Sequence, residues 1–238
     1  MSSAPLTIVC WKWSSPGYRS EFGPEAVNVL RRMVSRHYVR PHRFCCVTNE
    51  PKGIDPQVEI IPDREDFKDI PSPHGGRNPS CYRRLRLFAP DAGEIFGPRF
   101  VSLDLDCVIV RDMIPVWDRP EPFVIWGDTN PKTLYNGSMM LLKAGARTVV
   151  WNNFNPKHSP RLAQSSGNFG SDQAWISFCL GRGEKKWSRI DGVYSYRNEI
   201  MRRGSMLPPD ARIVMFHGLT DPWSPEAQRL SWVRQHWI

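Results

Sequence analysis

The sequence predicts an α/β fold in which a mostly parallel sheet is flanked by helices within a single domain. Two observations support this class. Apolar runs typical of buried strands alternate with segments in which apolar residues recur at helical spacing. The chain of 238 residues also has the length at which one α/β unit with a sizeable core is common. Alternation of this kind favours parallel strands joined by helices that cover the sheet.

The first half of the chain gives five expected elements in order. Residues 6–11 form an apolar run that includes β-branched side chains, which favours a strand. Pro24 suits the first turn of the helix that follows, and the apolar face of this helix consists of Ala26, Val27, Leu30, Val34 and Tyr38. Short apolar runs predict strands at 44–47 and 58–61. A loop rich in proline and glycine, residues 70–79, then leads into a helix that contains Tyr82, Leu85, Leu87 and Phe88.

The second half begins with the run 100–110, which is apolar except for one serine and two aspartates and therefore predicts a buried strand. Further strands are expected at 123–126, 138–142 and 213–216, and helices near 144–154 and 172–180. In a sheet of this kind ligands bind at the carboxyl ends of the strands. Asp104 and Asp106 lie at such an end.

These two aspartates are the first candidates for chemistry. In a strand, residues i and i+2 point to the same side. Two carboxylates placed together in an apolar setting are costly unless a divalent cation or a buried base faces them. Oxygen ligands of this kind suit Mn²⁺ or Mg²⁺, which bridge the phosphate oxygens of a nucleotide. The alternative is a strand that ends in a solvated turn with two surface acids.

The net charge of +8 favours an anionic partner such as nucleotide phosphates, nucleic acid or an acidic membrane surface. The basic residues are densest at 77–86 and 182–212, and the alternative is that they are simply solvated. The six cysteines include no C-x-x-C pair and are typical of reduced core thiols. No run approaches the ~18 consecutive apolar residues of a membrane span, and no secretory signal is visible. We therefore expect a cytoplasmic protein.

Five motifs occur in an order that resembles a known family. They are Leu103-Asp104-Leu105-Asp106 with the preceding Tyr82-Arg83-Arg84-Leu85, Tyr135-Asn136-Gly137-Ser138-Met139-Met140, Ser171-Asp172-Gln173, Phe216-His217-Gly218, and Pro222-Trp223. This order is that of glycosyltransferases with the GT-A fold, and the chain looks most like glycosyltransferase family 8. The resemblance runs from the first strand to Trp223. It implies a metal-dependent, retaining transfer of a sugar from a nucleotide sugar, with a UDP-sugar as the first expectation.

The resemblance implies how the metal and the nucleotide are held. Asp104 and Asp106 would bind Mn²⁺ or Mg²⁺ on the donor diphosphate, with His217 as the third protein ligand, and Asp104 would also lie near the ribose or donor sugar. Trp11 and Lys12 would border the nucleotide. Within the single domain 1–238, the part that binds the nucleotide sugar would be about residues 1–110, and the acceptor-side part about 111–238.

The resemblance also implies residues around the donor sugar. Arg84 would face the sugar, and Asn136 and Gly137 would line its pocket. Asp172 would bond to sugar hydroxyls. Gln173 would lie on the face of the anomeric carbon opposite the leaving group, and since it is not a carboxylate, a covalent glycosyl-enzyme is not supported.

Each of these assignments has a purely structural alternative. Arg84 also fits a solvated helix arginine, and Asn136-Gly137 fits an ordinary turn. Asp172 fits an acid at a helix N-terminus, where the helix dipole favours it. His217 fits a buried histidine of the core.

The sequence departs from the family pattern at two positions. Met215 stands where the family usually has its metal-binding histidine, and Asp221 stands where it has a lysine before Pro-Trp. His217 would therefore reach the metal only if the strand end is shifted. Because Asp221 cannot neutralise a leaving diphosphate, that charge would have to be met by Lys12, Arg83 or the basic segment after Arg182.

The acceptor is the least defined part of the prediction. A basic chain fits an anionic polymer, including duplex DNA with a hydroxymethylated base, which would have to be flipped out past an aromatic wedge. The candidates for that wedge are Trp187, Tyr194 and Tyr196, which are set among basic residues. The alternative is that the same segment forms a solvated lid over the donor. Saccharide, lipopolysaccharide-type or other lipid-linked glycan, and protein acceptors are the alternatives. A further alternative is a module that binds a nucleotide sugar without turnover.

Overall fold

The structure, a computed structural model, describes residues 4–14, 21–73, 80–127 and 133–238. Its centre is a seven-stranded sheet with the strand order β3-β2-β1-β4-β7-β6-β8. The neighbours β3-β2, β2-β1, β1-β4 and β6-β8 are parallel, and β7 is antiparallel to both β4 and β6. The predicted mostly parallel sheet is therefore confirmed. The strands are β1 (Leu6–Trp11), β2 (His42–Val47), β3 (Glu59–Ile61), β4 (Arg99–Leu103), β6 (Phe123–Trp126), β7 (Asn136–Lys143) and β8 (Lys185–Trp187).

A second, three-stranded sheet has the order β5-β10-β9. Its strands are β5 (Cys107–Ile109), β9 (Val193–Ser195) and β10 (Ile213–Met215). The prediction of one continuous strand over 100–110 is therefore wrong. The run contains β4 of the large sheet and β5 of the small one, and the chain bends at residues 104–106 between them. Apolar side chains continue through the bend because both sheets bury their strands in the same core.

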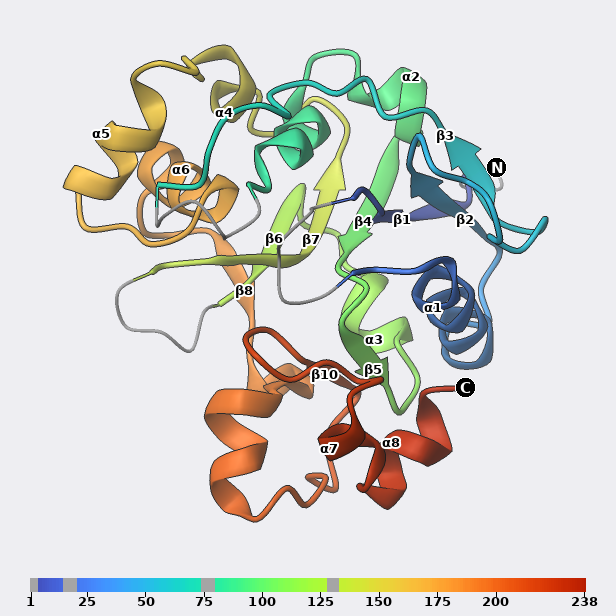
Figure 1. The fold of residues 1–238 in the computed structure, drawn as a ribbon. Coiled ribbons are helices and arrows are strands. Elements are labelled where there is room, and N and C mark those ends of the chain that lie inside the picture. Colours follow the sequence, from blue (N-terminus) through green and yellow to red (C-terminus); the bar gives the residue numbers. More distant parts are fainter. Residues whose placement is uncertain (1–3, 15–20, 74–79, 128–132) are drawn as a thin grey trace.

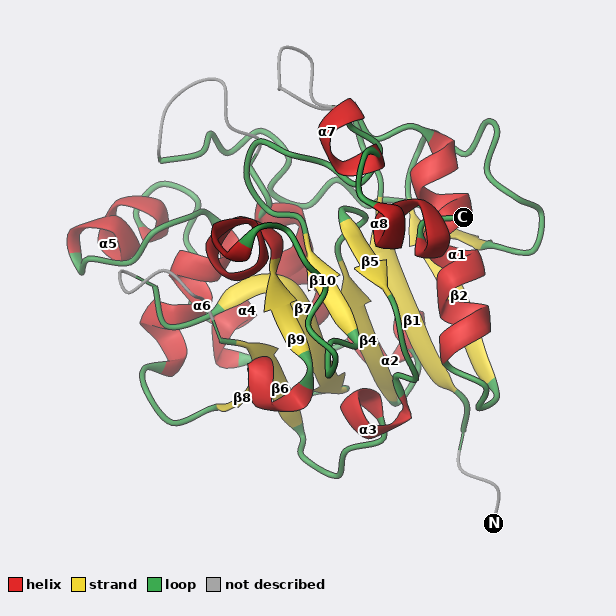
Figure 2. Ribbon diagram, turned by 90° about the horizontal axis from the view of Figure 1, so that it is seen from below, coloured by secondary structure: helices red, strands yellow, loops and turns green. Residues whose placement is uncertain are grey.

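Helices cover both sides of the large sheet (Figure 1). Three helices, α1, α7 and α8, lie on the same side of the large sheet as the small sheet. The helices α2, α4, α5 and α6 lie on the other side. Figure 2 looks onto the first of these sides, with β5, β9 and β10 in front of the large sheet. The helices are α1 (Pro24–His37), α2 (Ala92–Phe96), α3 (Ile114–Trp117), α4 (Val149–Asn152), α5 (Ser159–Ser165), α6 (Asp172–Leu180), α7 (Pro225–Gln228) and α8 (Ser231–His236).

Two expected helices are shorter or tighter than the sequence suggested. The segment Tyr82–Phe88 is a 3₁₀ helix rather than an α-helix, and the helix expected near 144–154 is the short α4. Further tight turns are the 3₁₀ segments Arg189–Asp191 and Met201–Arg203 and the π-helical segment Tyr196–Ile200. Among the helices of the described ranges, none combines the length and apolar character that a membrane crossing requires.

The alternation of side chains along β1 divides the core in two. Ile8 and Cys10 pack with α1 and the small sheet on one side, while Val9 and Trp11 pack with the 3₁₀ segment Tyr82–Phe88, α2, α4 and α6 on the other. This is the period of two expected for a strand buried on both faces. Both sides of the large sheet are therefore covered, and its carboxyl edge is the place left for a ligand.

The aromatic wedge proposed from the sequence is not formed. Trp187 is fully buried, and Tyr194 and Tyr196 are 8% and 5% exposed. Trp187 donates its indole N–H to the carbonyl of Val116 at 3.0 Å, and Tyr196 stacks on Phe216 with a centroid separation of 4.3 Å. These rings belong to the core, so the interpretation of this segment as a base-flipping wedge is wrong.

Candidate active site

The candidate active site lies where the chain leaves the large sheet. The strands β1, β2, β3 and β4 are parallel, so their carboxyl ends share one edge. Directly after β4, Asp104 donates its backbone N–H to the carbonyl of Ser138 in β7 at 2.9 Å. Asp104 and Asp106 are partly exposed, whereas Leu105 between them is buried. The bend thus holds Leu105 in the core and presents both carboxylates at the edge of the sheet.

Arg84 is the centre of the site. It is only 5% exposed, and its guanidinium is shared by three acceptors that are far apart in the sequence. Its Nε donates to Oδ2 of Asp172 at 2.9 Å, its Nη1 donates to the carbonyl of Gly137 at 3.2 Å, and Nη1 also pairs with Oδ1 of Asp104. Four of the residues expected in the site are therefore in contact. The alternative of Arg84 as a solvated helix arginine is wrong.

The charges of this cluster depend on one another. Burial disfavours the charge of Arg84, but the carboxylates of Asp104 and Asp172 outweigh this effect and raise the pKa of Arg84 above its usual value. Burial raises the pKa of Asp172, and the nearby Arg84 counteracts part of that rise. Each charge in the cluster therefore depends on its partners. Removal of the guanidinium would leave the buried carboxylate of Asp172 without a counter-charge, which is strongly destabilising.

Gly137 is required by the closeness of Arg84. A Cβ atom at this position would lie 2.9 Å from Nη2 of Arg84 and 3.1 Å from Oδ2 of Asp172. Both distances are shorter than ordinary contacts of a methyl group, so a side chain would displace the ion pair. The neighbouring Asn136 is buried at the start of β7 and accepts a hydrogen bond from the backbone N–H of Ser138 at 2.9 Å. Asn136 and Gly137 are thus the first two residues of β7, and Gly137 lies beside Arg84.

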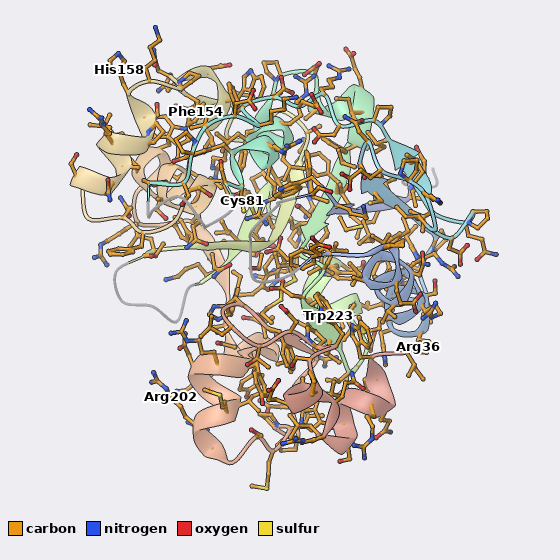
Figure 3. The ribbon with its side chains drawn as sticks, in the orientation of Figure 1. Arg36, Cys81, Phe154, His158, Arg202 and Trp223 are labelled. Atoms are coloured by element: carbon orange, nitrogen blue, oxygen red, sulfur yellow. The ribbon has the colours of Figure 1, made fainter. Side chains whose placement is uncertain are left out.

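Asp172 is the first residue of α6, and Ser171 connects it to the segment before Arg84. The hydroxyl of Ser171 accepts the backbone N–H of Cys81 at 3.0 Å. Burial raises the pKa of the Cys81 thiol to about 12, so this thiol is protonated at neutral pH. In Figure 3, Cys81 lies near the middle of the molecule. Sequence reasoning missed Ser171 as a connecting residue, because a serine before a helix is also an ordinary N-terminal residue.

Gln173 does not contact the arginine cluster through the hydrogen bonds that the structure shows. It donates Nε2 to the carbonyl of Phe169 at 3.2 Å. The side chain packs over Gly170, whose φ is +106° and where a Cβ atom would lie 2.5 Å from Cγ of Gln173. Glycine at this position therefore both allows the left-handed backbone and makes room for the glutamine.

Asp106 and His217 belong to neighbouring segments. The backbone N–H of Phe216 donates to the carbonyl of Asp106 at 2.7 Å, which places His217 one residue beyond this contact. Nε2 of His217 lies 2.7 Å from the hydroxyl of Ser195, and the imidazole ring packs against Trp126 with a centroid distance of 5.3 Å. Ser195 gave no signal in the sequence, since it is separated from the other motifs and belongs to the small sheet.

The carboxylate oxygens of Asp104 and Asp106 are ligand atoms of the kind that a hard divalent cation prefers. Asp104 and Asp106 directly follow β4 and are both partly exposed, so two carboxylates are available at this bend. Mg²⁺ is commonly held by one or two carboxylates together with substrate phosphates. Within the described ranges, no three side chains of His, Cys, Asp or Glu are grouped so that the protein alone would hold a metal. Asp104 and Asp106 would therefore need further ligands, such as substrate phosphates, to hold a cation here.

Trp11 and Lys12, the residues expected around the nucleotide, lie at the end of β1 and directly after it, on the edge where β2 and β3 also end. A pocket of about 400 Å³ is lined there by the last residues of the three strands, Trp11, Val47 and Ile61. The indole N–H of Trp11 is buried and has no hydrogen-bond partner among the residues that the structure describes. Lys12 pairs with Glu50, with Nζ 2.8 Å from Oε2. Trp11 therefore lines the pocket, whereas Lys12 follows it in the chain and is already paired with a carboxylate.

Arg83, the second cation expected to meet the diphosphate charge, is also paired. Its Nη1 contacts Oδ2 of the buried Asp63, and its guanidinium lies 5.5 Å from the ring centroid of Trp13. Asp63 and Glu50 were not predicted as part of the site, because isolated acids in loops carry no spacing signal. Both cations would have to exchange or share a carboxylate partner to contact a ligand.

Comparison with known proteins gives structural matches only. No protein-family model matches the sequence, and no curated protein matches it. The galactosyltransferase LgtC, solved with donor and acceptor sugar analogues, matches with a TM-score of 0.63 and 15% identity over 96% of this chain and 93% of that chain. A structure of an active-site glutamine-to-glutamate variant of LgtC matches similarly, with a TM-score of 0.64.

Two further matches have the same architecture. The glycosyltransferase GlyE of Streptococcus pneumoniae TIGR4 has a TM-score of 0.56 and 10% identity, over 98% of this chain and 63% of that chain. Mouse xyloside xylosyltransferase 1 has a TM-score of 0.52 and 13% identity, over 90% of this chain and 98% of that chain. At these identities the matches establish the fold. The chain has the α/β architecture of GT-A glycosyltransferases, and the structural likeness to family 8 is confirmed.

Proposed function

We propose that this protein is a metal-dependent, retaining glycosyltransferase that moves a sugar from a nucleotide sugar, first of all a UDP-sugar, to an acceptor hydroxyl. The observation that carries the proposal is the buried guanidinium of Arg84, which joins Asp104, Gly137 and Asp172 at the carboxyl edge of the sheet. The support from similarity is that solved glycosyltransferases share the fold over almost the whole chain. A buried charge cluster of this kind at a ligand-binding edge is costly to maintain for stability alone.

In this proposal the cluster holds the donor sugar. Asp172 accepts hydrogen bonds from sugar hydroxyls through Oδ1, which does not contact Nε of Arg84 and accepts only a long hydrogen bond of 3.4 Å from the hydroxyl of Ser171. Arg84 fixes the orientation of Asp172 and Asp104 at once. Asn136 and Gly137 line the sugar pocket, and the bare Cα of Gly137 keeps the guanidinium close to the backbone. The protein thereby offers the sugar a rigid set of acceptors before it binds.

Asp104 and Asp106 are the residues that would hold Mn²⁺ or Mg²⁺ against the donor diphosphate, and His217 is the candidate for a third protein donor. When bound, such a cation stabilises the negative charge on the departing diphosphate. Trp11 lines the pocket at the ends of β1, β2 and β3 and would border the nucleotide there. Lys12 and Arg83 add positive charge on this side of the molecule. Lys12 already forms an ion pair with Glu50, and Arg83 forms one with Asp63.

The face of the sugar opposite the diphosphate carries no protein carboxylate in this assignment. Gln173 is the expected residue there, and an amide is a poor nucleophile compared with a carboxylate. We therefore propose attack of the acceptor from the face that the diphosphate leaves. The acceptor oxygen bonds to the anomeric carbon, the bond to the diphosphate oxygen breaks, and the proton of the acceptor hydroxyl passes to that phosphate oxygen.

The proposal is tested with the full-length protein and a panel of sugar nucleotides. We expect UDP to be released in the presence of Mn²⁺ and not with EDTA. The variants Asp104→Asn and Asp106→Asn should each abolish release while leaving the thermal midpoint near that of wild type. Asp69→Asn, a substitution of an exposed acid in a loop, is the matched control. UDP release that persists in EDTA and in both variants would refute the metal assignment. Donor binding without release would identify a binding module instead.

The proposed acceptor is a saccharide rather than a nucleic-acid base. The residues suggested as a base-flipping wedge are buried in the core, so duplex binding would rest on exposed basic side chains alone, such as those of Lys185, Lys186 and Arg189. DNA with hydroxymethylcytosine is included as a competing acceptor. Sugar addition to that base, with steep salt dependence of binding, would overturn the saccharide proposal.

A further inference from the structure

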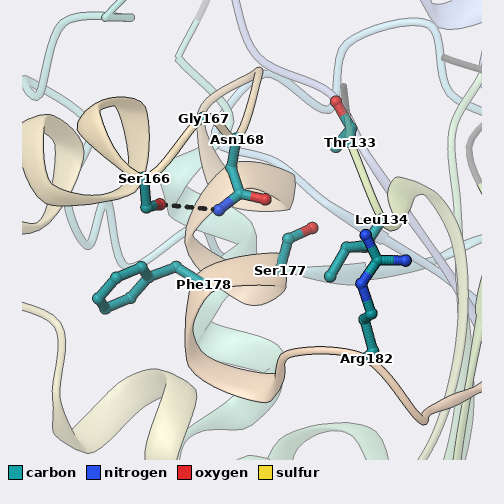
Figure 4. Close-up of a pocket in the computed structure, with 8 residues that line it drawn as sticks. All are labelled: Thr133, Leu134, Ser166, Gly167, Asn168, Ser177, Phe178 and Arg182. Carbon is teal, nitrogen blue, oxygen red and sulfur yellow. Dashed lines mark hydrogen bonds between the residues drawn. The ribbon is translucent and has the colours of Figure 1, made fainter. Parts of the chain in front are cut away.

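A second pocket lies across α6 and shares no residue with the Arg84 cluster. Its volume is about 390 Å³, which is within the size range of small-molecule sites. The residues that matter for its chemistry are Thr133, Leu134, Asn168, Ser177, Phe178 and Arg182. Figure 4 shows Phe178 on one side of the helix and Arg182 on the other. We refer to it as the α6 pocket.

Two buried hydroxyls line this pocket. The residues Ser177 and Thr133 are 2% and 5% exposed, respectively. Within the described ranges neither hydroxyl oxygen has a hydrogen-bond partner. In Figure 4 the Ser177 hydroxyl and the amide oxygen of Asn168 turn toward the side on which Arg182 lies. Buried polar groups are nearly always hydrogen-bonded, and leaving them unpaired is costly. Both hydroxyl oxygens are almost inaccessible to water, so a ligand would bond to them after a small shift of the pocket wall.

Arg182 supplies a positive charge at the rim. It is exposed and lies between Gly181 and Gly183, and no carboxylate of the described residues pairs with it. The adjacent acid, Glu184, is held by Arg147 through two contacts of 2.6 and 2.9 Å. The charge of Arg182 is therefore not neutralised by its nearest acidic neighbour in the sequence.

The turn that carries Arg182 is held by a buried tyrosine. The hydroxyl of Tyr135 donates to the carbonyl of Gly181 at 2.6 Å and accepts the backbone N–H of Glu184 at 3.2 Å. Because both hydrogen bonds end on the backbone, the position of this turn does not depend on the side chain of Arg182. A guanidinium presented from a fixed turn is suited to paired contacts with a carboxylate or phosphate.

Phe178 supplies a fixed apolar face. Its ring stacks on Trp175 with a centroid distance of 5.4 Å and an interplanar angle of 20°, and it remains 37% exposed. Trp175 is itself held by a hydrogen bond from its indole N–H to the carbonyl of Val150 at 2.8 Å. A rigid ring beside unpartnered hydroxyls matches a ligand that has both apolar C–H faces and hydroxyl groups.

We propose that the α6 pocket binds an acidic sugar unit, a pyranose that carries a carboxylate or a phosphate. The C–H face of the sugar packs on Phe178, its hydroxyls bond to Ser177 and Asn168, and its anionic group pairs with Arg182. The pocket and the Arg84 site are close along the chain, since Ser177 and Phe178 lie on α6, which begins at Asp172, and Thr133 and Leu134 directly precede the segment that leads into β7 at Asn136. Ser177 lies five residues along α6 from Asp172, or about 7.5 Å of helix rise. On the basis of the proposed function, this acidic unit belongs to the acceptor.

The first test measures binding without any nucleotide. Nitrogen-15 correlation spectra of the full-length protein are recorded during titration with methyl glucuronide, glucose 6-phosphate, methyl glucoside and inorganic phosphate. We expect both acidic sugars to shift the amide signals of Asn168, Gly181 and Gly183, with affinities at least about tenfold above those of the neutral sugar and of phosphate. Equal affinity for methyl glucoside, or equal affinity for phosphate and glucose 6-phosphate, would overturn the proposal. The two acidic probes distinguish a carboxylate from a phosphate as the preferred group.

Three variants assign the contacts. Arg182→Ala should reduce the affinity for acidic sugars to that for methyl glucoside, whereas Arg202→Ala, the same loss of charge at an exposed residue in the other part of the molecule (Figure 3), should have no effect. Ser177→Ala should weaken binding severalfold while leaving the thermal midpoint unchanged or higher, because its buried hydroxyl has no partner to lose among the described residues. Unchanged sugar binding in both Arg182→Ala and Ser177→Ala would refute the assignment.

Failure of this proposal and failure of the proposed function are separable. UDP-sugar breakdown is measured on the same samples without any acidic sugar. Donor breakdown without acidic-sugar binding refutes the α6 pocket as a sugar site and leaves the proposed function standing. Acidic-sugar binding without donor breakdown supports the pocket, and it removes the basis for describing the bound unit as part of an acceptor.

Discussion

Arg84 and Asp172 are 88 residues apart in the sequence and form a buried ion pair in which Nε donates to Oδ2 at 2.9 Å. The pair joins the 3₁₀ segment Tyr82–Phe88 to the first residue of α6. Both side chains are nearly inaccessible to water, with 5% and 2% exposure. The same guanidinium contacts Asp104 at the end of β4. One cation thus connects three elements that meet at the carboxyl edge of the large sheet.

Replacing Arg84 by methionine should destabilise the protein strongly. The substitution leaves Asp172 buried without its cation, and removing one partner of a buried ion pair typically costs about 3–5 kcal/mol. Urea unfolding followed by far-UV circular dichroism measures this change. Arg202→Met is the control, because Arg202 is exposed. If Arg84→Met and Arg202→Met unfold at the same urea concentration, Arg84 does not carry the buried charge of Asp172.

Gly137→Ala should impair sugar transfer much more than folding. The new methyl group would lie 2.9 Å from Nη2 of Arg84 and would displace the guanidinium. Small displacements of a positioned group can lower turnover by roughly 10²-fold. Transfer rate and thermal midpoint are measured for Gly137→Ala and for Gly23→Ala, whose φ of −71° suits alanine and whose Cβ would meet nothing within 4 Å. Similar transfer rates for the two variants would show that the close approach of Gly137 and Arg84 has no role in transfer.

Asp172→Asn should lower turnover more than nucleotide affinity. In the proposed function Asp172 contacts the sugar, which reacts, whereas the nucleotide lies near Trp11. A contact to the reacting group is expected to affect the transition state more than the affinity for the rest of the donor. Transfer kinetics and calorimetric binding of UDP give the two quantities, and asparagine retains one oxygen for Arg84. An equal loss of UDP affinity and turnover would place Asp172 in the nucleotide site.

Stability should depend on Glu121 in a defined pH range. Hydrogen bonds from Arg119, with Nη2 2.6 Å from Oε1, lower the pKa of Glu121 from 4.5 to about 2. A lowered folded-state pKa stabilises the folded protein above the unfolded value and loses that effect as the pH falls through the folded value. The difference in thermal midpoint between wild type and Glu121→Gln should therefore be constant above about pH 4.5 and shrink toward about pH 2.

Glu226→Gln, a substitution of an exposed acid at the start of α7, is the control for this series. Its midpoint should follow wild type throughout, since solvent screens an isolated surface charge. A Glu121→Gln difference that stays constant down to pH 2 would show that the pair with Arg119 does not set the ionisation of Glu121. Solvent also screens the partly exposed pair of Arg119 and Glu121. We therefore expect its loss to change the thermal midpoint by a few degrees at most.

Much of the large sheet was predictable because its strands are short apolar runs separated by clear breaks. Local patterns missed the division of 100–110 into β4 and β5. An apolar run reports burial, and both strands are buried although they belong to different sheets. The same limit explains the incorrect interpretation of Trp187, Tyr194 and Tyr196. Aromatic residues among basic ones look like a binding surface, but only tertiary packing shows that the rings face inward while the cations face outward.

The site was predictable where motif order carried information. The resemblance named Arg84, Asp104, Gly137 and Asp172, and the fold brings these four together. It gave no indication of Glu50, Asp63 or Ser195, which contact Lys12, Arg83 and His217 respectively. Such partners lie in loops or in the other sheet, and no local spacing relates them to the residues they contact. The roles of the metal-binding and nucleotide-binding residues stay predictions.

The bend at residues 104–106 has a mechanical consequence. Leu103 is the last residue of β4 in the large sheet, and Cys107 is the first residue of β5 in the small sheet. The two aspartates therefore lie in the segment that joins the two sheets. Any ligand that both carboxylates hold is attached to both sheets at once. Its binding energy then opposes separation of the sheets as well as opening of either one. A bound ligand would therefore stabilise both sheets together. Backbone amide hydrogen exchange should slow in β5 and β10 as well as in β4 when the ligand is bound.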